Sequence, residues 1–327
     1  SEVGSGDVLV GLPTVPFRDE EVRVRLGPAY YAYLRVAEGC NHNCTFCAIP
    51  GFRGSFRSKG FDTIVEEARQ LVARGAREIN LIAEDTNQWG MDFGPDDERR
   101  LPELLRALSD IEDLKWIRLL YCYPSYFTEP LVEAIATLPK VVKYIDIPLQ
   151  HASGPVLSRM QRPGPQHTEN LLKKLRERIP ELVLRTTFIS GFPGETEQDH
   201  SATRAFARSL GFERGGAFAY SEEDGTPAAG FDDQIEPELR QRRREQLERG
   251  FQRRAEVWAD RQVGRRLDIL VDRMEGDVAI GRSYADAPDI DNVVKIPGAV
   301  VPFEPGMVVR CEIVEVDGLD LVGVVVE

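Results

Sequence analysis

Short apolar and β-branched runs alternate with helical patterns between about Tyr31 and Tyr220. Their centres recur about every 37 residues, a spacing that fits βα units joined by short loops in a parallel sheet. Six units are fewer than the eight of a closed barrel, so the pattern predicts a partial α/β barrel of the TIM type. Its active face is expected at the carboxyl ends of the strands. The expected strands are residues 32–36, 79–82, 116–120, 144–147, 182–189 and 216–220.

Two helices of this region carry clear start and stop signals. We expect Asp62 to cap the first crossover helix and Gly75 to end it. After the fifth strand, Thr196 and Asp199 form a capping pair that opens another helix. The buried face of the first helix is predicted to contain Ile64, Val65, Ala68, Leu71 and Val72.

The last third of the chain changes pattern twice. Residues 232–256 are highly charged, but seven arginines are matched by seven acids, so we expect a solvated connecting helix and not a nucleic-acid site. Residues 259–327 contain short strands broken by Gly, Pro and Asp, which predicts a small all-β barrel. The expected organisation is an N-terminal lead-in (1–30), the partial barrel (31–231), a helical linker (232–258) and the small barrel (259–327).

The net negative charge of the chain limits the kinds of molecule that it is expected to bind. The chain carries a net charge of −13, and residues 259–327 hold seven basic against fourteen acidic residues, a net of −7. This balance disfavours direct binding to nucleic acid or to an anionic membrane and favours a basic partner. No apolar run approaches the roughly 20 residues that span a bilayer, and the first residues lack a secretory pattern. The expected compartment is the cytoplasm.

Three of the five cysteines lie within eight residues, directly after the first strand. Thiolates at Cys40, Cys44 and Cys47 can ligate three irons of a 4Fe–4S cluster and leave the fourth iron open to a ligand. A structural zinc site is the alternative, but it needs a fourth ligand, and His42 is poorly placed to provide it. A catalytic thiol is a weaker alternative. Cys122 and Cys311 lie in apolar strand patterns and are predicted to be buried structural thiols.

The Cys-x3-Cys-x2-Cys loop, with Phe46 before its third cysteine, resembles that of the radical S-adenosylmethionine (SAM) superfamily. This resemblance implies a partial α/β barrel in which the open iron chelates the amine and carboxylate of SAM. The reduced cluster then cleaves SAM to a 5′-deoxyadenosyl radical, and the protein orients SAM and excludes water.

Several further runs resemble the methylthiotransferase branch of that superfamily. They are residues 38–42, 146–153 and 188–196, together with the C-terminal barrel, which is similar to a TRAM domain. Within the branch, residues 149–153 and 281–288 resemble the members that modify the β-carbon of an aspartate in the twelfth small-subunit ribosomal protein. Members that modify tRNA usually carry Gln-Ser-Gly-Ser in the first of these runs. Ribosomal proteins are basic, so the acidic C-terminal barrel favours this partner.

The resemblance also implies parts that this sequence does not contain. Methylthiotransferases have an additional N-terminal domain that holds a second 4Fe–4S cluster, implicated in sulfur delivery, whereas about 30 residues without cysteine precede the barrel here. One SAM methylates sulfur at that cluster, and a second yields the radical. An electron donor is required as well. We expect this chain to be a truncated form that binds one cluster and SAM but does not complete methylthiolation.

Candidate SAM contacts follow from matching positions in the resemblance. Glu84 and Asp85 end the second strand, where relatives place polar groups against the SAM amine, although they could be ordinary turn residues. Arg185 suits a carboxylate, or could be a structural ion-pair partner. His151 could transfer protons or be structural. The further candidates are Phe46, Gln150, Ser153, Gly191 and Gly194 for the cofactor and Tyr121, Tyr123 and Tyr126 for the cavity wall.

The sequence therefore predicts a radical SAM methylthiotransferase that acts on a ribosomal protein, with no single residue assigned as catalytic. Two alternatives remain open at this point. One keeps the chemistry and changes the substrate to tRNA. The other is a metal-stabilised binding module without catalysis.

Overall fold

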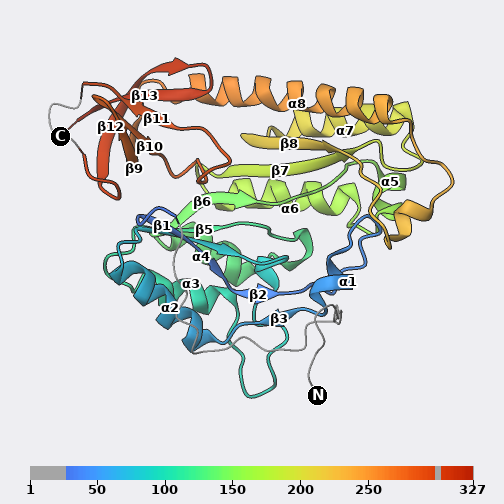
Figure 1. The fold of residues 1–327 in the computed structure, drawn as a ribbon, viewed down its shortest axis with the longest axis horizontal. Helices are drawn as coiled ribbons and strands as arrows, with labels where there is room; N and C mark the ends of the chain where they lie inside the picture. Colours follow the sequence, from blue (N-terminus) through green and yellow to red (C-terminus); the bar gives the residue numbers. More distant parts are fainter. Residues whose placement is uncertain (1–26, 299–302, 327) are drawn as a thin grey trace, which may run out of the picture.

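A six-stranded parallel sheet forms the body of the computed structural model, which describes residues 27–298 and 303–326. The strands follow one another in chain order across the sheet, and helices cover its outer side (Figure 1). The predicted partial barrel and its six strands are thereby confirmed, whereas most of the expected lead-in, residues 1–30, lies outside the described residues. The strands are β1 (Tyr31–Arg35), β4 (Glu78–Ile82), β5 (Trp116–Leu119), β6 (Val141–Asp146), β7 (Val183–Ser190) and β8 (Arg214–Ala219).

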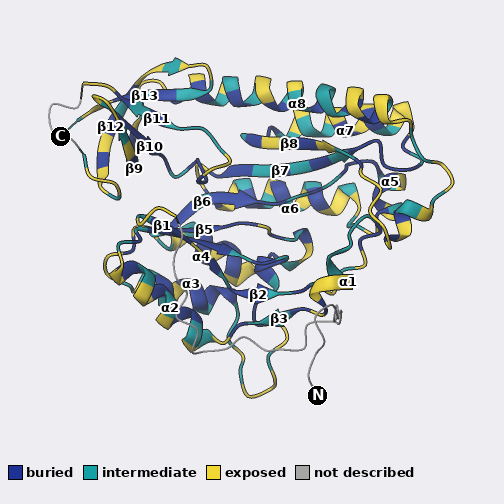
Figure 2. Ribbon diagram, viewed as in Figure 1, coloured by how far each residue is buried: buried dark blue, intermediate teal, exposed yellow. Residues whose placement is uncertain are grey.

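Alternation along the strands separates an apolar outer layer from a polar interior. In β4, Ile79 and Leu81 join the main apolar core beneath the helices, whereas Glu78 and Asn80 face the interior of the partial barrel. Figure 2 shows buried strands under helices whose outer faces are exposed. The helices are α1 (Ile49–Arg53), α2 (Phe61–Ala73), α3 (Leu101–Ser109), α4 (Glu129–Thr137), α5 (Gly154–Arg159), α6 (Pro165–Arg178) and α7 (Glu197–Leu210).

The two predicted helix starts have different outcomes. Thr196 and Asp199 form the expected capping box of α7. The expectation for α2 was wrong, because Gly60 is its N-cap and Asp62 lies inside the first turn without a capping hydrogen bond. Asp62 still places a negative charge near the positive end of the helix dipole.

The charged stretch forms helix α8 (Pro237–Asp260), and it is more than a solvated connection. Leu247 and Phe251 pack into the main core, and the guanidinium groups of Arg240 and Arg243 are buried. The helix lies along β7 and β8 for most of its length (Figure 1). Within the described residues, no helix is both long and apolar enough to span a membrane.

The C-terminal region is a closed five-stranded barrel, as predicted. Its strand order is β10-β11-β13-β12-β9, and its core contains Ile269, Ile313 and Leu321. The strands are β9 (Arg266–Glu275), β10 (Val278–Arg282), β11 (Val294–Ile296), β12 (Val308–Asp317) and β13 (Asp320–Val325).

A buried ionic network joins the small barrel to the amino ends of the sheet strands. Glu78 accepts hydrogen bonds from Arg118 Nε at 2.8 Å and from Arg282 Nη1 at 2.6 Å. Arg282 also donates through Nε and Nη2 to both oxygens of Asp272, at 2.8 and 3.0 Å. Because Glu78 and Arg118 are fully buried, each charge depends on its partner for stability.

Replacing Glu78 by Gln should destabilise the protein strongly, because it leaves two buried guanidinium groups without their shared carboxylate. We expect a loss of about 3 to 5 kcal/mol in the free energy of unfolding, measured by urea denaturation at pH 7. Glu275→Gln is the matched control, since its exposed pair with Arg273 should contribute under about 1 kcal/mol. Equal losses in both variants would contradict the importance of burial.

The same network gives stability a defined pH dependence. Burial alone would raise the pKa of Glu78, but Arg282 and Arg118 lower it below the ordinary value of 4.5. The unfolded chain therefore takes up this proton first as the pH falls. The contribution of Glu78 is complete above about pH 4.5 and is lost below it, and this part of the acid dependence should disappear in Glu78→Gln.

Candidate active site at the carboxyl ends of the strands

The cysteine loop follows a short strand, β2 (Ala37–Glu38), which pairs with β3 (Arg57–Ser58). The loop is held at its start by Cys40 N–H, which donates to Gly54 O, and in its middle by Thr45, whose hydroxyl donates to Arg159 O. Gly39 has φ +75°, and a Cβ there would lie 2.3 Å from Ser55 O. Only glycine fits this approach, so the entry into the loop is fixed by the backbone.

The three cysteines of the loop line one side of a single cavity of about 230 Å³. Burial raises the pKa of Cys40 to about 11 and also raises that of Cys47, so these two thiols hold their protons at neutral pH. A bound metal would stabilise the thiolates instead. Among residues 27–298 and 303–326, no three His, Cys, Asp or Glu side chains are grouped to hold one metal ion. A 4Fe–4S cluster offers each thiolate its own iron, so it does not require three side chains to converge on one ion.

His42 forms part of the cavity wall and is held by two neighbouring side chains. Its Nε2 lies 2.7 Å from Asp85 Oδ2, and its ring stacks on Tyr123 with centroids 3.7 Å apart. Asp85 is 1% exposed and does not line the cavity. The sequence placed it against SAM, but the structure places it behind His42, where it can orient the ring.

Glu84 is the predicted contact that the geometry supports most directly. It lines the cavity, and its Oε1 accepts a hydrogen bond from Arg35 Nη1 at 3.1 Å. Its Oε2 is buried without a hydrogen-bond partner. A buried carboxylate oxygen with no donor is costly, so this atom fits a ligand that brings a cationic amine. The SAM amine is such a group.

Gln150 and Phe46, two further candidates for cofactor contact, also line the cavity. Gln150 has φ +70°, an uncommon conformation for a residue with a side chain. Its backbone is tied to β7 on both sides, because its N–H donates to Thr187 O and its O accepts from Ile189 N–H. The strain is therefore maintained by the sheet.

The sequence did not indicate one cavity residue, Arg162, and predicted only a structural role for another, Cys122. Arg162 Nη1 lies 3.8 Å from Cys44 Sγ, and its guanidinium lies over the Tyr123 ring at 4.3 Å. It follows α5 in an Arg-Pro-Gly turn, which gave no sequence signal for a site. Cys122 is buried, as predicted, but it also forms part of the cavity wall.

The remaining polar candidates do not line the cavity. Ser153 donates its hydroxyl proton to Asp199, a contact that ties the start of α5 to α7. Arg185 Nη1 pairs with Asp146 Oδ1 at 3.0 Å, within the interior of the partial barrel. Of the tyrosines, Tyr121 and Tyr123 line the cavity, and Tyr126 stacks at 5.7 Å on His42.

Gly191 and Gly194 are required by packing. Both have positive φ, and a Cβ would lie 2.4 Å from Arg240 Cγ in the first case and 2.4 Å from Asp233 Oδ2 in the second. The turn thus fits closely against the start of α8 and the segment before it. No approach of adenine is needed to explain the two glycines.

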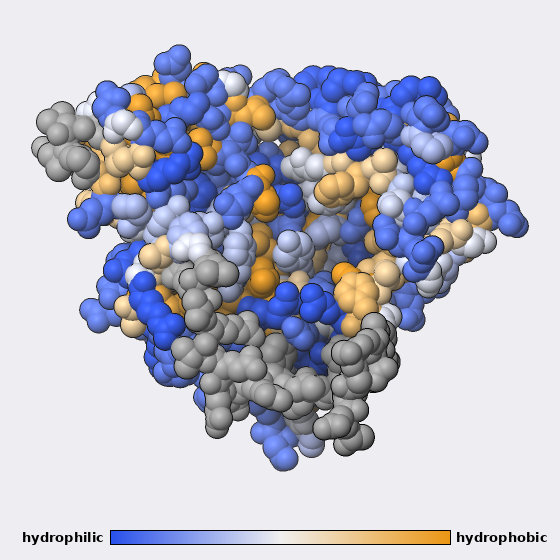
Figure 3. Space-filling model, in the orientation of Figure 1, coloured by the Kyte–Doolittle hydropathy of each residue, from blue (hydrophilic) through white to orange (hydrophobic). Residues whose placement is uncertain are grey.

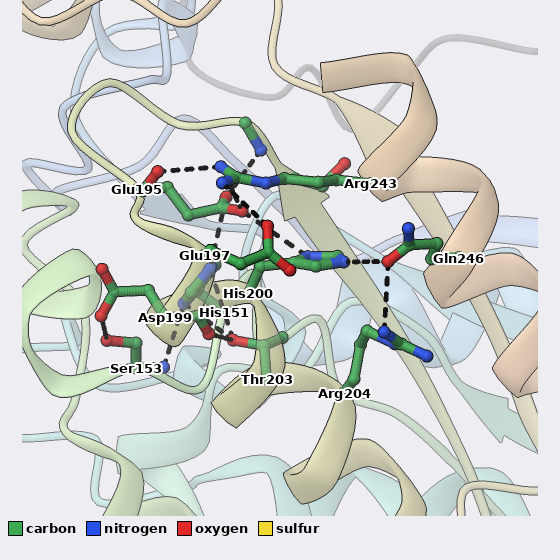
Figure 4. A network of polar contacts seen from close by, with 12 residues as sticks. His151, Ser153, Glu195, Glu197, Asp199, His200, Thr203, Arg204, Arg243 and Gln246 are labelled. Carbon is green, nitrogen blue, oxygen red and sulfur yellow. Dashed lines mark hydrogen bonds and ion pairs between the residues drawn. The ribbon is translucent and has the colours of Figure 1, made fainter. Parts of the chain in front are cut away.

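A buried network holds this turn and the segment after Gln150 (Figure 4). Glu195 accepts a hydrogen bond from Gly191 N–H at 2.6 Å and pairs with Arg243 Nη1 at 3.1 Å. Its carboxylate lies 3.5 Å from His151 Nε2 and 3.6 Å from His200 Nδ1. Burial lowers the pKa of His200, so this ring is neutral at pH 7. His151 is buried here, outside the cavity, which favours a structural role.

The interior of the partial barrel is accessible from outside. Figure 3 shows a hollow in the middle of this face of the molecule, in which apolar and hydrophilic surfaces alternate. Exposed aromatic residues include Tyr121, Tyr33 and Phe218, with 49, 42 and 65% exposure.

Comparison with known proteins identifies the two parts of the chain. Residues 34–207 match the radical SAM superfamily, and residues 263–326 match the TRAM domain. Two curated relatives named "Ribosomal protein uS12 methylthiotransferase RimO" were found in Desulfitobacterium hafniense and Caldanaerobacter subterraneus. The first is 44% identical over 96% of this chain and 71% of its own, and the second is 43% identical over 92% and 68%.

A solved structure supports the fold alone. Coproporphyrinogen III oxidase (HemN) from Escherichia coli, described as a radical SAM enzyme, aligns with a TM-score of 0.51 and 13% identity, over 78% of this chain and 67% of its own. The sequence matches are much closer and cover both domains. The chain therefore belongs to the radical SAM superfamily and, within it, to the RimO family of ribosomal protein uS12 methylthiotransferases.

Proposed function

We propose that this protein transfers a methylthio group to the β-carbon of an aspartate in ribosomal protein uS12, with a 4Fe–4S cluster and SAM as cofactors. Family membership supports the reaction. The observation that carries it at the site is one cavity lined by three thiols and by Glu84, whose Oε2 is buried without a hydrogen-bond partner.

Each wall of the cavity has a separate task in this proposal. Cys40, Cys44 and Cys47 hold three irons, and Glu84 Oε2 accepts hydrogen bonds from the SAM amine. When bound and reduced, the cluster supplies the electron that splits SAM and so starts hydrogen abstraction from the target carbon. Arg162 lies beside Cys44 and brings a positive charge to the edge of the proposed cluster site.

The sulfur is proposed to come from a second 4Fe–4S cluster, as the family resemblance implies. This chain offers no second set of three cysteines, because Cys122 and Cys311 are buried in different domains. The second cluster would need ligands beyond this sequence.

The partner is proposed to be uS12 or the ribosome that contains it. Acidic groups of the TRAM barrel attract a basic protein and repel RNA, so direct binding to nucleic acid is not expected. Part of this charge is not available at the surface, because Asp272, Asp286 and Asp291 are buried against the partial barrel. We also propose that the reaction takes place in the cytoplasm with a separate electron donor.

The two alternatives are not favoured. A tRNA substrate does not agree with relatives at 40–44% identity that are named for uS12. A binding module without catalysis does not agree with membership of the radical SAM superfamily.

Cys44→Ala should abolish cluster binding, because it removes one of three thiolates in the loop. After anaerobic reconstitution with iron and sulfide, we expect about four irons per chain in the native protein and almost none in the variant. Deoxyadenosine formation from SAM and dithionite should follow the iron content. Cys311→Ala, in the core of the TRAM barrel, should retain both. Unfolding of Cys44→Ala, together with no SAM cleavage by the reconstituted native protein, would favour the binding module.

Glu84→Gln should weaken SAM binding, because the neutral amide attracts the SAM amine less than a carboxylate does. The expected rise in KM for SAM is about 10- to 100-fold, as for loss of a charged hydrogen bond. Glu38→Gln is the control, since Glu38 also pairs with Arg35 but does not line the cavity. A similar KM in the two variants would remove Glu84 from the binding site.

Binding of uS12 should depend on acidic residues of the TRAM barrel. The exposed double variant Asp277→Lys/Glu315→Lys is expected to bind purified uS12 about three- to tenfold more weakly in a salt series followed by fluorescence anisotropy. Glu112→Lys/Asp113→Lys makes the same change of charge on the partial barrel and should bind as the native protein does. Tighter binding to tRNA than to uS12 by the native chain would support the alternative substrate.

A further inference from the structure

Residues 281–288 resemble the family but have no role in the proposed function. They begin a loop that enters the partial barrel at the amino ends of its strands. The loop connects β10 to β11, and Ala285 and Ala287 pack against Trp116, Val142 and Val183. These three residues lie at or near the first positions of β5, β6 and β7. The loop therefore closes the amino end of the strands, opposite the cysteine cavity.

Polar contacts fasten this loop on several strands. Arg214 Nη2 of β8 donates to Asp286 Oδ1 at 2.6 Å, and Tyr144 of β6 donates its hydroxyl proton to Asp291 Oδ2 at 2.7 Å. Asp291 Oδ2 also accepts from Ala287 N–H at 2.9 Å. The side chain of Asp291 is 4% exposed, so its negative charge is held in one place.

From Asp291 a continuous series of contacts leads up to the cavity. Asp291 Oδ1 lies 3.8 Å from Arg185 Nε, and Arg185 Nη1 donates to Asp146 Oδ1 at 3.0 Å. Asp146 Oδ2 accepts from Tyr121 N–H at 3.1 Å, and its backbone O accepts from Cys122 N–H at 2.9 Å. Tyr121 and Cys122 are both parts of the cavity wall.

The end of this series is a strained turn. Tyr121 has φ +58°, a left-handed conformation that costs a non-glycine residue on the order of 1 to 2 kcal/mol. Such a residue keeps its conformation only where its surroundings fix it. The carboxylate of Asp146 binds the Tyr121 amide directly, and Arg185 holds that carboxylate in place.

We infer that Asp291 of the TRAM domain is a positioning residue for the SAM cavity, acting through Arg185 and Asp146 on the Tyr121 turn. The TRAM domain is thereby part of the active-site architecture, in addition to any role in binding a partner. The inference rests on the proposed function only in taking the cavity as the SAM site. It also gives Arg185 a task away from SAM, as the link between two carboxylates.

The direct test is hydrogen–deuterium exchange of the whole chain without cofactors. Asp291→Asn keeps an acceptor for Tyr144 and Ala287 but removes the charge facing Arg185. Exchange at the amides of Tyr121 and Cys122 should increase at least about threefold relative to Asp277→Asn, an exposed acid of the same domain. Unchanged exchange at these amides would overturn the inference, whatever reaction the protein performs.

A double-mutant cycle on SAM cleavage provides a second readout. In reconstituted protein, Asp291→Asn and Arg185→Gln should each raise the KM for SAM about three- to tenfold, and the double variant should be no worse than Arg185→Gln alone. Additive effects, or an effect of Asp291→Asn no greater than that of Asp277→Asn, would contradict action through Arg185. If Asp291→Asn does not fold, Tyr144→Phe replaces it in both experiments, because it removes the hydrogen bond that holds the Asp291 carboxylate beside Arg185; increases in the same direction are expected, and unchanged exchange at Tyr121 and Cys122 would overturn the inference.

Discussion

The carboxylate of Glu78 is fully buried between guanidinium groups that come from both domains. A buried carboxylate and two buried arginines are tolerable only while all of them are in contact, because desolvation of a lone charge costs several kcal/mol. The partial barrel and the TRAM barrel therefore stabilise one another: each contributes one acid and one arginine to this network, Glu78 with Arg118 and Asp272 with Arg282, and the Glu78–Arg282 contact joins the two pairs. The rest of the partial barrel is built on this fixed layer of ion pairs at the amino ends of the strands.

The packing at the amino ends of the strands determines where in the barrel a reaction can take place. With the loop after β10 packed against the first residues of β5 to β7, the amino end of the barrel is filled, and the cysteine cavity lies at the opposite, carboxyl end. The residues around the cavity adopt conformations that are unfavourable in isolation, as Tyr121 and Gln150 both have positive φ. Two buried acids hold the surrounding turns: Asp146 binds the Tyr121 amide, and Glu195 binds the Gly191 amide. Rigid turns of this kind can keep a cofactor in one orientation before reaction begins.

In the folded chain, part of the charge counted in the sequence is buried and is not presented to a partner. The acidity of the TRAM region, taken as a whole, favours a basic partner, but some of its acids serve the interface with the partial barrel. The arginine-rich helix behaves similarly: Arg240 and Arg243 are buried and hold the turns beside the cavity, whereas other arginines of α8 are exposed. Net charge alone therefore overstates the charge that a partner meets.

The sequence by itself determined much of this protein. Strand periodicity predicted the six strands to within a few residues, because alternation and length are local properties, and the spacing of Cys40, Cys44 and Cys47 placed three thiols on one loop. The loop also pointed to the family, and Glu84 and Gln150 were correctly expected at the carboxyl ends of strands. Tertiary structure alone decided which polar residues reach the cavity. Asp85 pairs with His42, Ser153 with Asp199 and Arg185 with Asp146, and the two members of each pair are 39 to 46 residues apart in the sequence. Arg162 lies in the site and Arg282 bridges the two domains for the same reason. The partner of a side chain depends on which segments lie together in the folded chain, and the local sequence pattern does not contain that information.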